Sequence, residues 1–199
     1  METFVVDVTD FEKTTTIVKT ILHENSLDLV VANAGVSVGH HNEITPIEDF
    51  SRVINTNLVS IHNLLIPIIE AMQKQQSGKI ALISSMASYV TMPSSIAYSV
   101  SKRALSAYAE GLRNQFKKAN IKVINIKPGF IASEITAKND FKMPFFLETS
   151  KGVDRIYYAI ENDKYEYAFP KRFWIIVKTI SLLPRGLKDY LIQKAHFKK

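Results

Sequence analysis

Short apolar runs rich in β-branched residues alternate with longer segments of helical periodicity along almost the whole chain. Near-continuous apolar runs of this length are typical of strands that are buried on both faces of a parallel sheet. The intervening segments are long enough to form helices that cover the two faces of such a sheet. The alternation therefore predicts an α/β fold with a doubly wound parallel sheet.

Five strands and at least five helices are expected from this pattern. The expected strands are Phe4 to Val8, Asp28 to Asn33, Lys79 to Ser84, Lys122 to Lys127 and Tyr165 to Phe169. The expected helices are Phe11 to Glu24, Ile47 to Lys74 with a kink at Pro67, Tyr98 to Lys118, Gly152 to Asn162, and one or two more after Pro170.

Composition and length fit a single domain over residues 1–199. The chain is 46% hydrophobic and 22% charged, which are ordinary values for a globular protein. It has no cysteine, which suits a reducing compartment. No apolar run reaches the ~18 residues of a membrane-spanning helix, and Glu2 and Asp7 stand where a signal peptide carries basic residues. We therefore expect a soluble, cytoplasmic protein.

Tyr98 and Lys102 form a pair spaced for acid/base chemistry, and Ser85 precedes the tyrosine by thirteen residues. On a helix, two residues four positions apart project from the same face, so the ammonium can lie beside the phenol. An unperturbed tyrosine titrates near pH 10, and a nearby cation lowers that pKa. The pair therefore predicts a tyrosine that exchanges protons near neutral pH.

This spacing resembles that of the short-chain dehydrogenase/reductase family, and further segments match the family in the expected order. Asn57 matches the helix asparagine that completes the family's catalytic tetrad with Ser85, Tyr98 and Lys102. The resemblance implies a Rossmann-like fold and also implies cofactor contacts. Those implied contacts are Asp7 and Val8 near the adenine, the Asn33, Ala34 and Gly35 turn, Tyr98 and Lys102, and Pro128, Gly129, Ile131 and Ser133 around the nicotinamide. The family usually has threonine where this chain has Ser133, so the hydroxyl is kept.

One family feature is absent from the sequence: the glycine-rich turn that holds the cofactor pyrophosphate at a helix N-terminus. The seven glycines form neither G-x-x-x-G-x-G nor G-x-G-x-x-G. Since Phe4 to Val8 resembles the family's third strand, we expect a Rossmann-like sheet that lacks the first two strands. Phe4 to Val8 then either pairs directly with Asp28 to Asn33 or leaves that strand with an open edge.

The resemblance implies hydride transfer between NAD or NADP and a carbonyl or alcohol substrate. Tyr98 would donate the proton, Ser85 would hydrogen-bond the carbonyl oxygen, Lys102 would lower the Tyr98 pKa and hold the ribose, and Asn57 would anchor a water. Without the glycine-rich turn we expect weak cofactor binding, and the preference between NAD and NADP is unreadable. The alternative is a non-catalytic remnant that acts as an oligomeric or membrane-surface interaction protein.

Aromatic residues between Ile135 and Leu147 stand where the family has its substrate lid, which predicts an apolar substrate. Packing of these aromatic side chains over the core is an equal alternative. The long helices Ile47 to Lys74 and Tyr98 to Lys118 predict a homodimer or homotetramer, because the family pairs them between subunits. No metal site is expected, since His40 and His41 have no acidic or cysteine partners at ligand spacing.

Residues 170–199 form a basic, amphipathic extension. From residue 164 onward the chain has nine basic and two acidic side chains, a net charge of +7 against +6 for the whole chain. Interleaved apolar residues predict packing against the domain or a second subunit, with peripheral membrane contact as the alternative. Nucleic-acid binding is not expected, because no base-stacking motif accompanies the charge.

Overall fold

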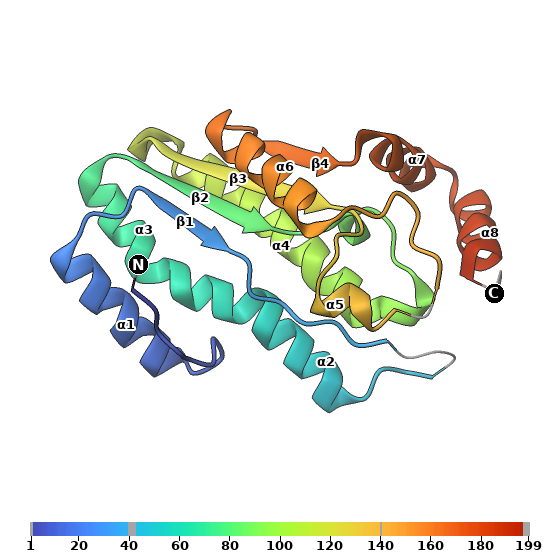
Figure 1. Ribbon diagram of the computed structural model, residues 1–199, viewed down its shortest axis with the longest axis horizontal. Helices are drawn as coiled ribbons and strands as arrows, with labels where there is room; N and C mark the ends of the chain where they lie inside the picture. The colour runs from blue at the N-terminus through green and yellow to red at the C-terminus, as the bar shows by residue number, and fades with distance from the viewer. Residues whose placement is uncertain (1, 40–42, 140, 197–199) are drawn as a thin grey trace.

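The computed structural model describes residues 2–39, 43–139 and 141–196, and within them it contains one four-stranded parallel sheet (Figure 1). The strands lie in the order β1, β2, β3, β4, so consecutive strands are neighbours. Their bounds are β1 Leu29–Ala32, β2 Gly78–Ile83, β3 Ile121–Pro128 and β4 Glu166–Phe169. Four of the five predicted strands and the α/β fold class are confirmed.

The helices also follow the predicted order. They are α1 (Phe11–Glu24), α2 (Ile47–Ile54), α3 (Ser60–Gln75), α4 (Ile96–Gln115), α5 (Glu134–Ala137), α6 (Thr149–Glu161), α7 (Lys171–Leu182) and α8 (Arg185–His196). A π-helical segment, Asn55–Val59, joins α2 and α3 into one long helix that contains Pro67. Two short 3₁₀ helices, η2 (Met86–Ser88) and η3 (Pro93–Ser95), lie between β2 and α4.

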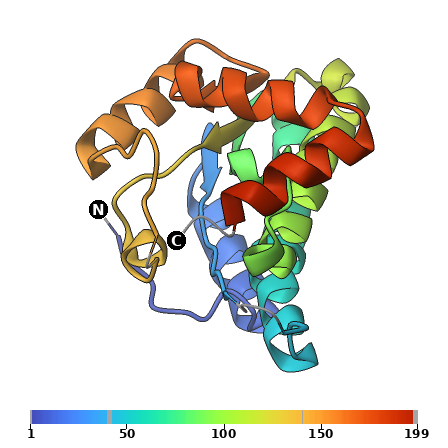
Figure 2. The ribbon, with the colours of Figure 1, turned by 90° about the vertical axis from the view of Figure 1, so that its right-hand side faces the viewer.

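Two apolar cores hold the sheet between its helical layers. On one face, Leu65 and Met72 of α3 and Leu105 of α4 pack with Ile80 of β2, and α1 packs against α3. On the other face, Ala159 and Ile160 of α6 pack against Ile124 and Ile126 of β3 and Phe169 of β4. Figures 1 and 2 show α3 and α4 on one side of the sheet and α6 on the other.

The helix Ile47–Gln75 is long and apolar enough to cross a membrane by length and composition, and its most apolar 18-residue window has a mean hydropathy of 1.2. This differs from the expectation that no segment would reach that limit. Half of its most apolar window is buried within the protein, and Leu65 and Met72 are fully buried in the core. The core helix of a soluble protein has the same properties, so the hydropathy is weak evidence for a membrane span.

The predicted strand Phe4 to Val8 is wrong. This segment carries no strand, and among the described residues β1 pairs only with β2. The chain instead turns at Asp7, whose carboxylate accepts hydrogen bonds from the amide and hydroxyl of Thr9, and Asp10 caps α1. These local side-chain bonds replace the hydrogen bonds of a strand ladder. Of the two alternatives, the structure therefore shows the open edge, with Leu29 and Val31 exposed.

Candidate active site

The predicted tetrad residues lie at the carboxyl ends of the parallel strands, where α/β proteins place their sites. Ser85 follows β2 and caps η2, with its hydroxyl accepting a hydrogen bond from the Ala87 amide at 3.1 Å. Tyr98 and Lys102 lie one turn apart on α4, and the lysine Nζ is 5.7 Å from the centre of the tyrosine ring. The Ser85 hydroxyl also lies close enough to the Tyr98 phenol to lower its pKa.

Asn57 is fully buried within the π-helical segment. Its Oδ1 accepts a hydrogen bond from the Val36 amide at 2.7 Å, and its Nδ2 donates to the Val36 carbonyl at 2.9 Å. A third bond runs from Nδ2 to the Ser101 hydroxyl at 3.0 Å, next to Lys102 on α4. Asn57 thus ties the turn after β1 to α4, and π-helical turns of this kind are frequent at functional sites.

The Asn33, Ala34 and Gly35 turn lies directly beside these residues. A Cβ atom added to Gly35 would be 3.4 Å from Asn57 Oδ1 and 3.4 Å from Lys102 Nζ. Only a very small side chain fits between the turn and these two polar atoms. The sequence-predicted turn and two members of the tetrad are therefore brought together.

Lys102 is buried, and its ammonium donates a hydrogen bond to the Ile83 carbonyl at 2.8 Å. Burial lowers the pKa of Lys102 to about 8. Burial also raises the pKa of the half-buried Tyr98, and the Ser85 hydroxyl opposes that rise. The expected lowering of the Tyr98 pKa by Lys102 is therefore not seen, because the ammonium is directed to a backbone carbonyl.

The Pro128 to Ser133 segment leaves the end of β3. The Gly129 amide donates to the Phe169 carbonyl at 2.8 Å, and Ile131 pairs with Leu147 and packs on Gly152. Ser133 caps α5, with its hydroxyl accepting from the Thr136 amide at 3.3 Å. Its hydroxyl is thus engaged in a helix cap.

The predicted adenine contacts Asp7 and Val8 lie near the N-terminus. Val8 is half-buried beside the Asp7 turn. The exposed Asp7 carboxylate accepts hydrogen bonds from Thr9, and those bonds lower the pKa of Asp7.

The predicted lid residues surround an aromatic cluster. Phe130 contacts Phe141 edge-on at 5.9 Å between ring centres and stacks on Phe173 of α7 at 5.7 Å. Phe145 also stacks on Phe173, at 5.8 Å. Phe141, Phe145 and Phe146 remain well exposed, so these rings pack on α7 and still offer an apolar surface to a ligand.

A second polar network adjoins the site and was not predicted. The Tyr89 hydroxyl donates to Glu166, and the buried Lys127 ammonium donates to the other Glu166 oxygen at 2.7 Å. Lys127 also lies 4.3 Å over the Tyr89 ring. Arg103 of α4 donates to the Tyr89 carbonyl at 3.1 Å. The network links the segment after Ser85 to the strand that ends at Pro128.

The available sequence signal for this network was Lys127 itself. A lysine within an apolar strand is rarely fully buried unless it is paired. Its partner Glu166 lies 39 residues away on the neighbouring strand, and no local pattern identifies such a pair.

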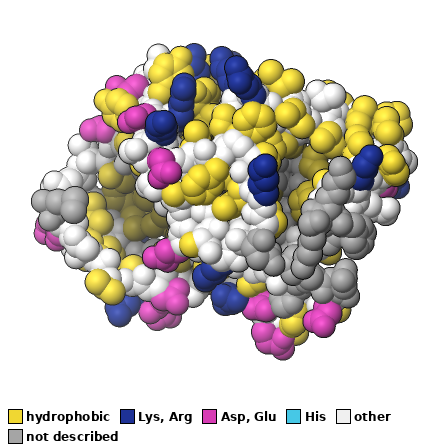
Figure 3. All heavy atoms as spheres, turned by 45° about the vertical axis from the view of Figure 1, so that its right-hand side comes forward, with side chains coloured by type: hydrophobic (Ala, Val, Ile, Leu, Met, Phe, Trp, Pro, Cys, Tyr) yellow, Lys and Arg dark blue, Asp and Glu magenta, His cyan; other side chains and the backbone are white. Residues whose placement is uncertain are grey.

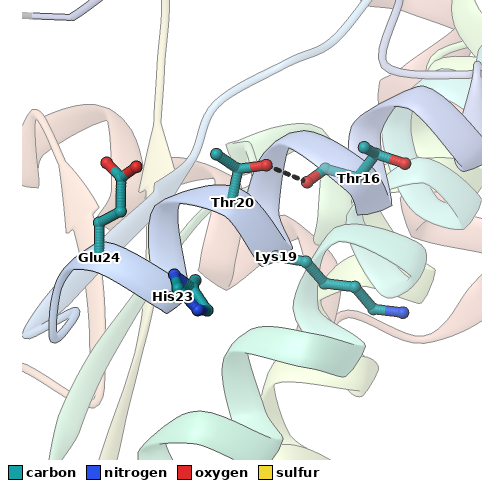
Figure 4. Close-up of a pocket in the computed structure, with 5 residues that line it drawn as sticks. All are labelled: Thr16, Lys19, Thr20, His23 and Glu24. Carbon is teal, nitrogen blue, oxygen red and sulfur yellow. Dashed lines mark hydrogen bonds between the residues drawn. The ribbon is translucent and has the colours of Figure 1, made fainter.

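Neither of two hollows on the described surface is lined by a tetrad residue. One lies on α1 and is lined by Thr16, Lys19, Thr20, His23 and Glu24 (Figure 4). These side chains all come from one helix, and the drawn hydrogen bond is internal, from the Thr20 hydroxyl to the Thr16 carbonyl at 3.1 Å. Among the described residues no cluster of His, Asp or Glu could hold a metal ion, and His40 and His41 lie outside those residues.

The fold and the grouping of Ser85, Tyr98, Lys102 and Asn57 define a Rossmann-like protein of the dehydrogenase type. A family model described as short chain dehydrogenase matches residues 1–143, and the chain belongs to this family.

Three similar proteins illustrate the relationship. An uncharacterized oxidoreductase of Myxococcus xanthus is 34% identical over 82% of this chain and 64% of its own length. A 3-ketodihydrosphingosine reductase of Bacteroides thetaiotaomicron is 30% identical over 76% of this chain and 60% of its own length. The solved structure of ElxO with NADP bound has a TM-score of 0.72 and 26% identity, covering 83% of this chain and 75% of that chain. The chain thus spans less than two thirds of the length of these two curated relatives.

Proposed function

We propose that the chain is an oxidoreductase that transfers a hydride between NAD(H) or NADP(H) and a carbonyl or alcohol substrate. The observation that carries the proposal is the pairing of the Ser85 and Tyr98 hydroxyls one helical turn from the buried Lys102 ammonium. Such a pair of hydroxyls offers one proton donor and one hydrogen-bond donor to a single carbonyl oxygen. The dinucleotide, when bound, supplies or accepts the hydride.

Each side chain has a separate role in the proposal. In the reducing direction, Tyr98 donates its proton to the carbonyl oxygen, while Ser85 donates a hydrogen bond that stabilises the developing charge. Lys102 supplies a positive charge next to the phenol, and its lowered pKa of about 8 leaves it partly able to exchange protons near neutral pH. Asn57 holds the backbone of Val36 and Ser101 of α4, which fixes the position of the site.

Residues for the dinucleotide are proposed at the Asn33 to Gly35 turn and along Pro128 to Ser133. Both segments follow the carboxyl ends of strands, and Gly35 is adjacent to Lys102. The similarity to ElxO with NADP bound supports a nicotinamide dinucleotide as the cofactor. Asp7 and Val8 remain proposed adenine contacts.

The substrate is proposed to be an apolar carbonyl compound or the corresponding alcohol. The exposed rings of Phe141, Phe145 and Phe146 offer an apolar surface beside the Pro128 to Ser133 segment. A relative named 3-ketodihydrosphingosine reductase supports a ketone with an apolar chain.

We also propose a homodimer or homotetramer formed through α3 and α4, in a protein that is cytoplasmic or peripheral at the membrane. Ile66 of α3 and Val100 of α4 are apolar and 46% and 40% exposed, which supports burial of these helices against another subunit. Light scattering at micromolar concentration tests this, and a monomeric mass would contradict it.

The test of the proposed reaction is a comparison of two tyrosines on α4. With millimolar NADPH or NADH and a panel of apolar ketones, Tyr98→Phe should reduce turnover by roughly 10² to 10⁴, the usual contribution of a positioned general acid. Tyr108→Phe is the matched control, because Tyr108 hydrogen-bonds His62 at 2.9 Å and lies outside the tetrad. Wild-type turnover in Tyr98→Phe, or no turnover in the unmodified chain, would contradict the proposal.

A further inference from the structure

The two C-terminal helices present apolar and basic side chains together. Exposed apolar side chains are Ile175, Ile176 and Leu182 of α7 and Leu187 and Tyr190 of α8, of which Leu182 is 74% exposed. With the exposed basic residues Lys171, Arg172 and Arg185 they form what we call the C-terminal surface. Figure 3 shows hydrophobic side chains gathered toward this end of the molecule, with Lys and Arg beside them. Large exposed apolar patches on a folded domain mark interaction sites.

α7 has two apolar faces, and only one of them packs on the protein. Phe173 is directed inward, where it stacks on Phe130 and Phe145 and contacts Gly129. Ile175 and Leu182 share another face, because positions seven residues apart lie on one stripe of a helix, and the neighbouring Ile176 is exposed at the edge of that stripe. No residue of α7 is fully buried. Ile175 and Leu182 are 56% and 74% exposed, so the outer stripe does not pack on the domain.

The charge around this stripe is mainly positive, although α8 also carries the exposed Asp189. Lys171 and Arg172 lie in the first turn of α7, Arg185 begins α8, and neither helix has an acidic residue in its first turn. Basic residues at a helix N-terminus add to the positive end of the helix dipole, which destabilises the free protein. A negatively charged partner would reverse that effect. Residues 164–199 carry nine basic and two acidic side chains, so the acidic residues of this segment neutralise little of its positive charge.

We propose that the C-terminal surface binds membranes that contain anionic lipids. The basic side chains would contact the headgroups, while Ile175, Ile176 and Leu182 enter the boundary between headgroups and acyl chains, as in interfacial amphipathic helices. A second copy of the chain fits this surface less well, because the contact would bring two basic patches together. Nucleic acid fits less well because exposed aliphatic side chains, which offer no base-stacking surface, accompany the basic ones. The proposal goes beyond hydride transfer and is tested without it.

The surface also adjoins the proposed site. Phe173, on the inner face of α7, touches both Gly129 and the lid residue Phe145. A bilayer in contact with the outer face of α7 would therefore lie one helix away from the apolar rings around the site. This arrangement is suited to a substrate that partitions into lipid.

Co-sedimentation of the full chain with vesicles tests the proposal. Vesicles of phosphatidylcholine and phosphatidylserine should bind the protein, and vesicles of phosphatidylcholine alone should bind it far less. Replacing Lys171, Arg172 and Arg185 together with Gln should weaken binding to the anionic vesicles by roughly 100-fold, since each basic residue near such a surface contributes about fivefold. Lys117→Gln with Lys118→Gln, two exposed lysines elsewhere, is the control and should leave most of the affinity.

A second variant tests the apolar side chains of the C-terminal surface. Ile175→Ser, Ile176→Ser and Leu182→Ser together should abolish sedimentation with anionic vesicles, whereas Val153→Ser, an equally exposed valine on α6, should not. Circular dichroism and light scattering show whether each variant keeps its fold and mass. The proposal is overturned by equal binding to both kinds of vesicle, by no binding of the unmodified chain, or by a serine variant that only converts an oligomer to a monomer.

Discussion

The Lys102 ammonium donates a hydrogen bond to the Ile83 carbonyl at 2.8 Å, and this bond crosses from α4 to the end of β2. It fixes the helix that carries Tyr98 against the strand that leads to Ser85. The lysine is only 3% exposed, and burial lowers its pKa to about 8. The same residue therefore positions the site and lowers the stability of the folded protein at neutral pH.

The first prediction concerns the stability that the protein loses by burying the Lys102 ammonium. Since the folded-state pKa of Lys102 lies below the unfolded value of 10.5, the unfolded chain binds more protons between about pH 8 and pH 10.5, and stability rises with pH in that window. Relative to Lys102→Met, the wild-type free energy of unfolding should increase by about 2 to 3 kcal/mol between pH 7 and pH 10. Denaturant titration at both pH values measures it. Lys118→Met, at an exposed position, should show no such trend, and a flat difference for Lys102→Met would contradict the prediction.

The sequence predicted those parts of the fold and site that depend on local spacing. The apolar runs at Lys79 to Ser84 and Lys122 to Lys127 became β2 and β3, and helical periodicity placed Tyr98 and Lys102 one turn apart. The bond from Lys102 to Ile83 was not predictable, because it depends on how α4 packs against β2. Phe4 to Val8 has a strand-like composition, but a strand forms only when a neighbour supplies hydrogen bonds, and the turn at Asp7 competed successfully.

The second prediction concerns Glu166, which pairs with the buried Lys127 and with Tyr89. Burial tends to raise the Glu166 pKa, but the hydrogen bonds from Lys127 and Tyr89 and the lysine charges outweigh it, so the pKa is lowered. Glu166→Gln leaves the Lys127 charge poorly compensated and should destabilise the protein by about 1 to 2 kcal/mol, a value reduced from that of a fully buried pair because the carboxylate is half exposed.

Two further measurements test the Glu166 prediction. Because the folded pKa is lowered, the contribution of Glu166 should be complete above the unfolded pKa of 4.5 and should disappear as the pH falls through the folded value. Thermal unfolding of Glu166→Gln and of the exposed control Glu161→Gln compares the two carboxylates. Adding Lys127→Met to Glu166→Gln should recover part of the loss, since it removes the unpaired charge. A double variant less stable than Glu166→Gln would argue against charge as the cause.

The third prediction compares two glycines. A Cβ atom added to Gly129 would lie 2.9 Å from a ring carbon of Phe173, so Gly129→Ala must displace α7 or the ring. We expect a loss of about 1 to 3 kcal/mol. Gly111→Ala meets no atom within 4 Å on the exposed side of α4, and it should stabilise the protein by about 0.5 to 1 kcal/mol through helix propensity. If Phe173→Leu does not relieve the loss in Gly129→Ala, the contact with the ring is not its origin.

The last prediction concerns nicotinamide dinucleotides, which the 199-residue chain should bind weakly. The sequence has no glycine-rich turn to direct backbone amides at the pyrophosphate. The proposed contacts from Asn33, Lys102 and the Pro128 segment would address mainly the nicotinamide half. Losing two or three charge-assisted hydrogen bonds at about 1.5 to 3 kcal/mol each would weaken a micromolar site to millimolar or worse. Calorimetric titration with NADH and with NADPH measures the affinity, and a low-micromolar dissociation constant for either would mean that other residues of this chain hold the phosphates.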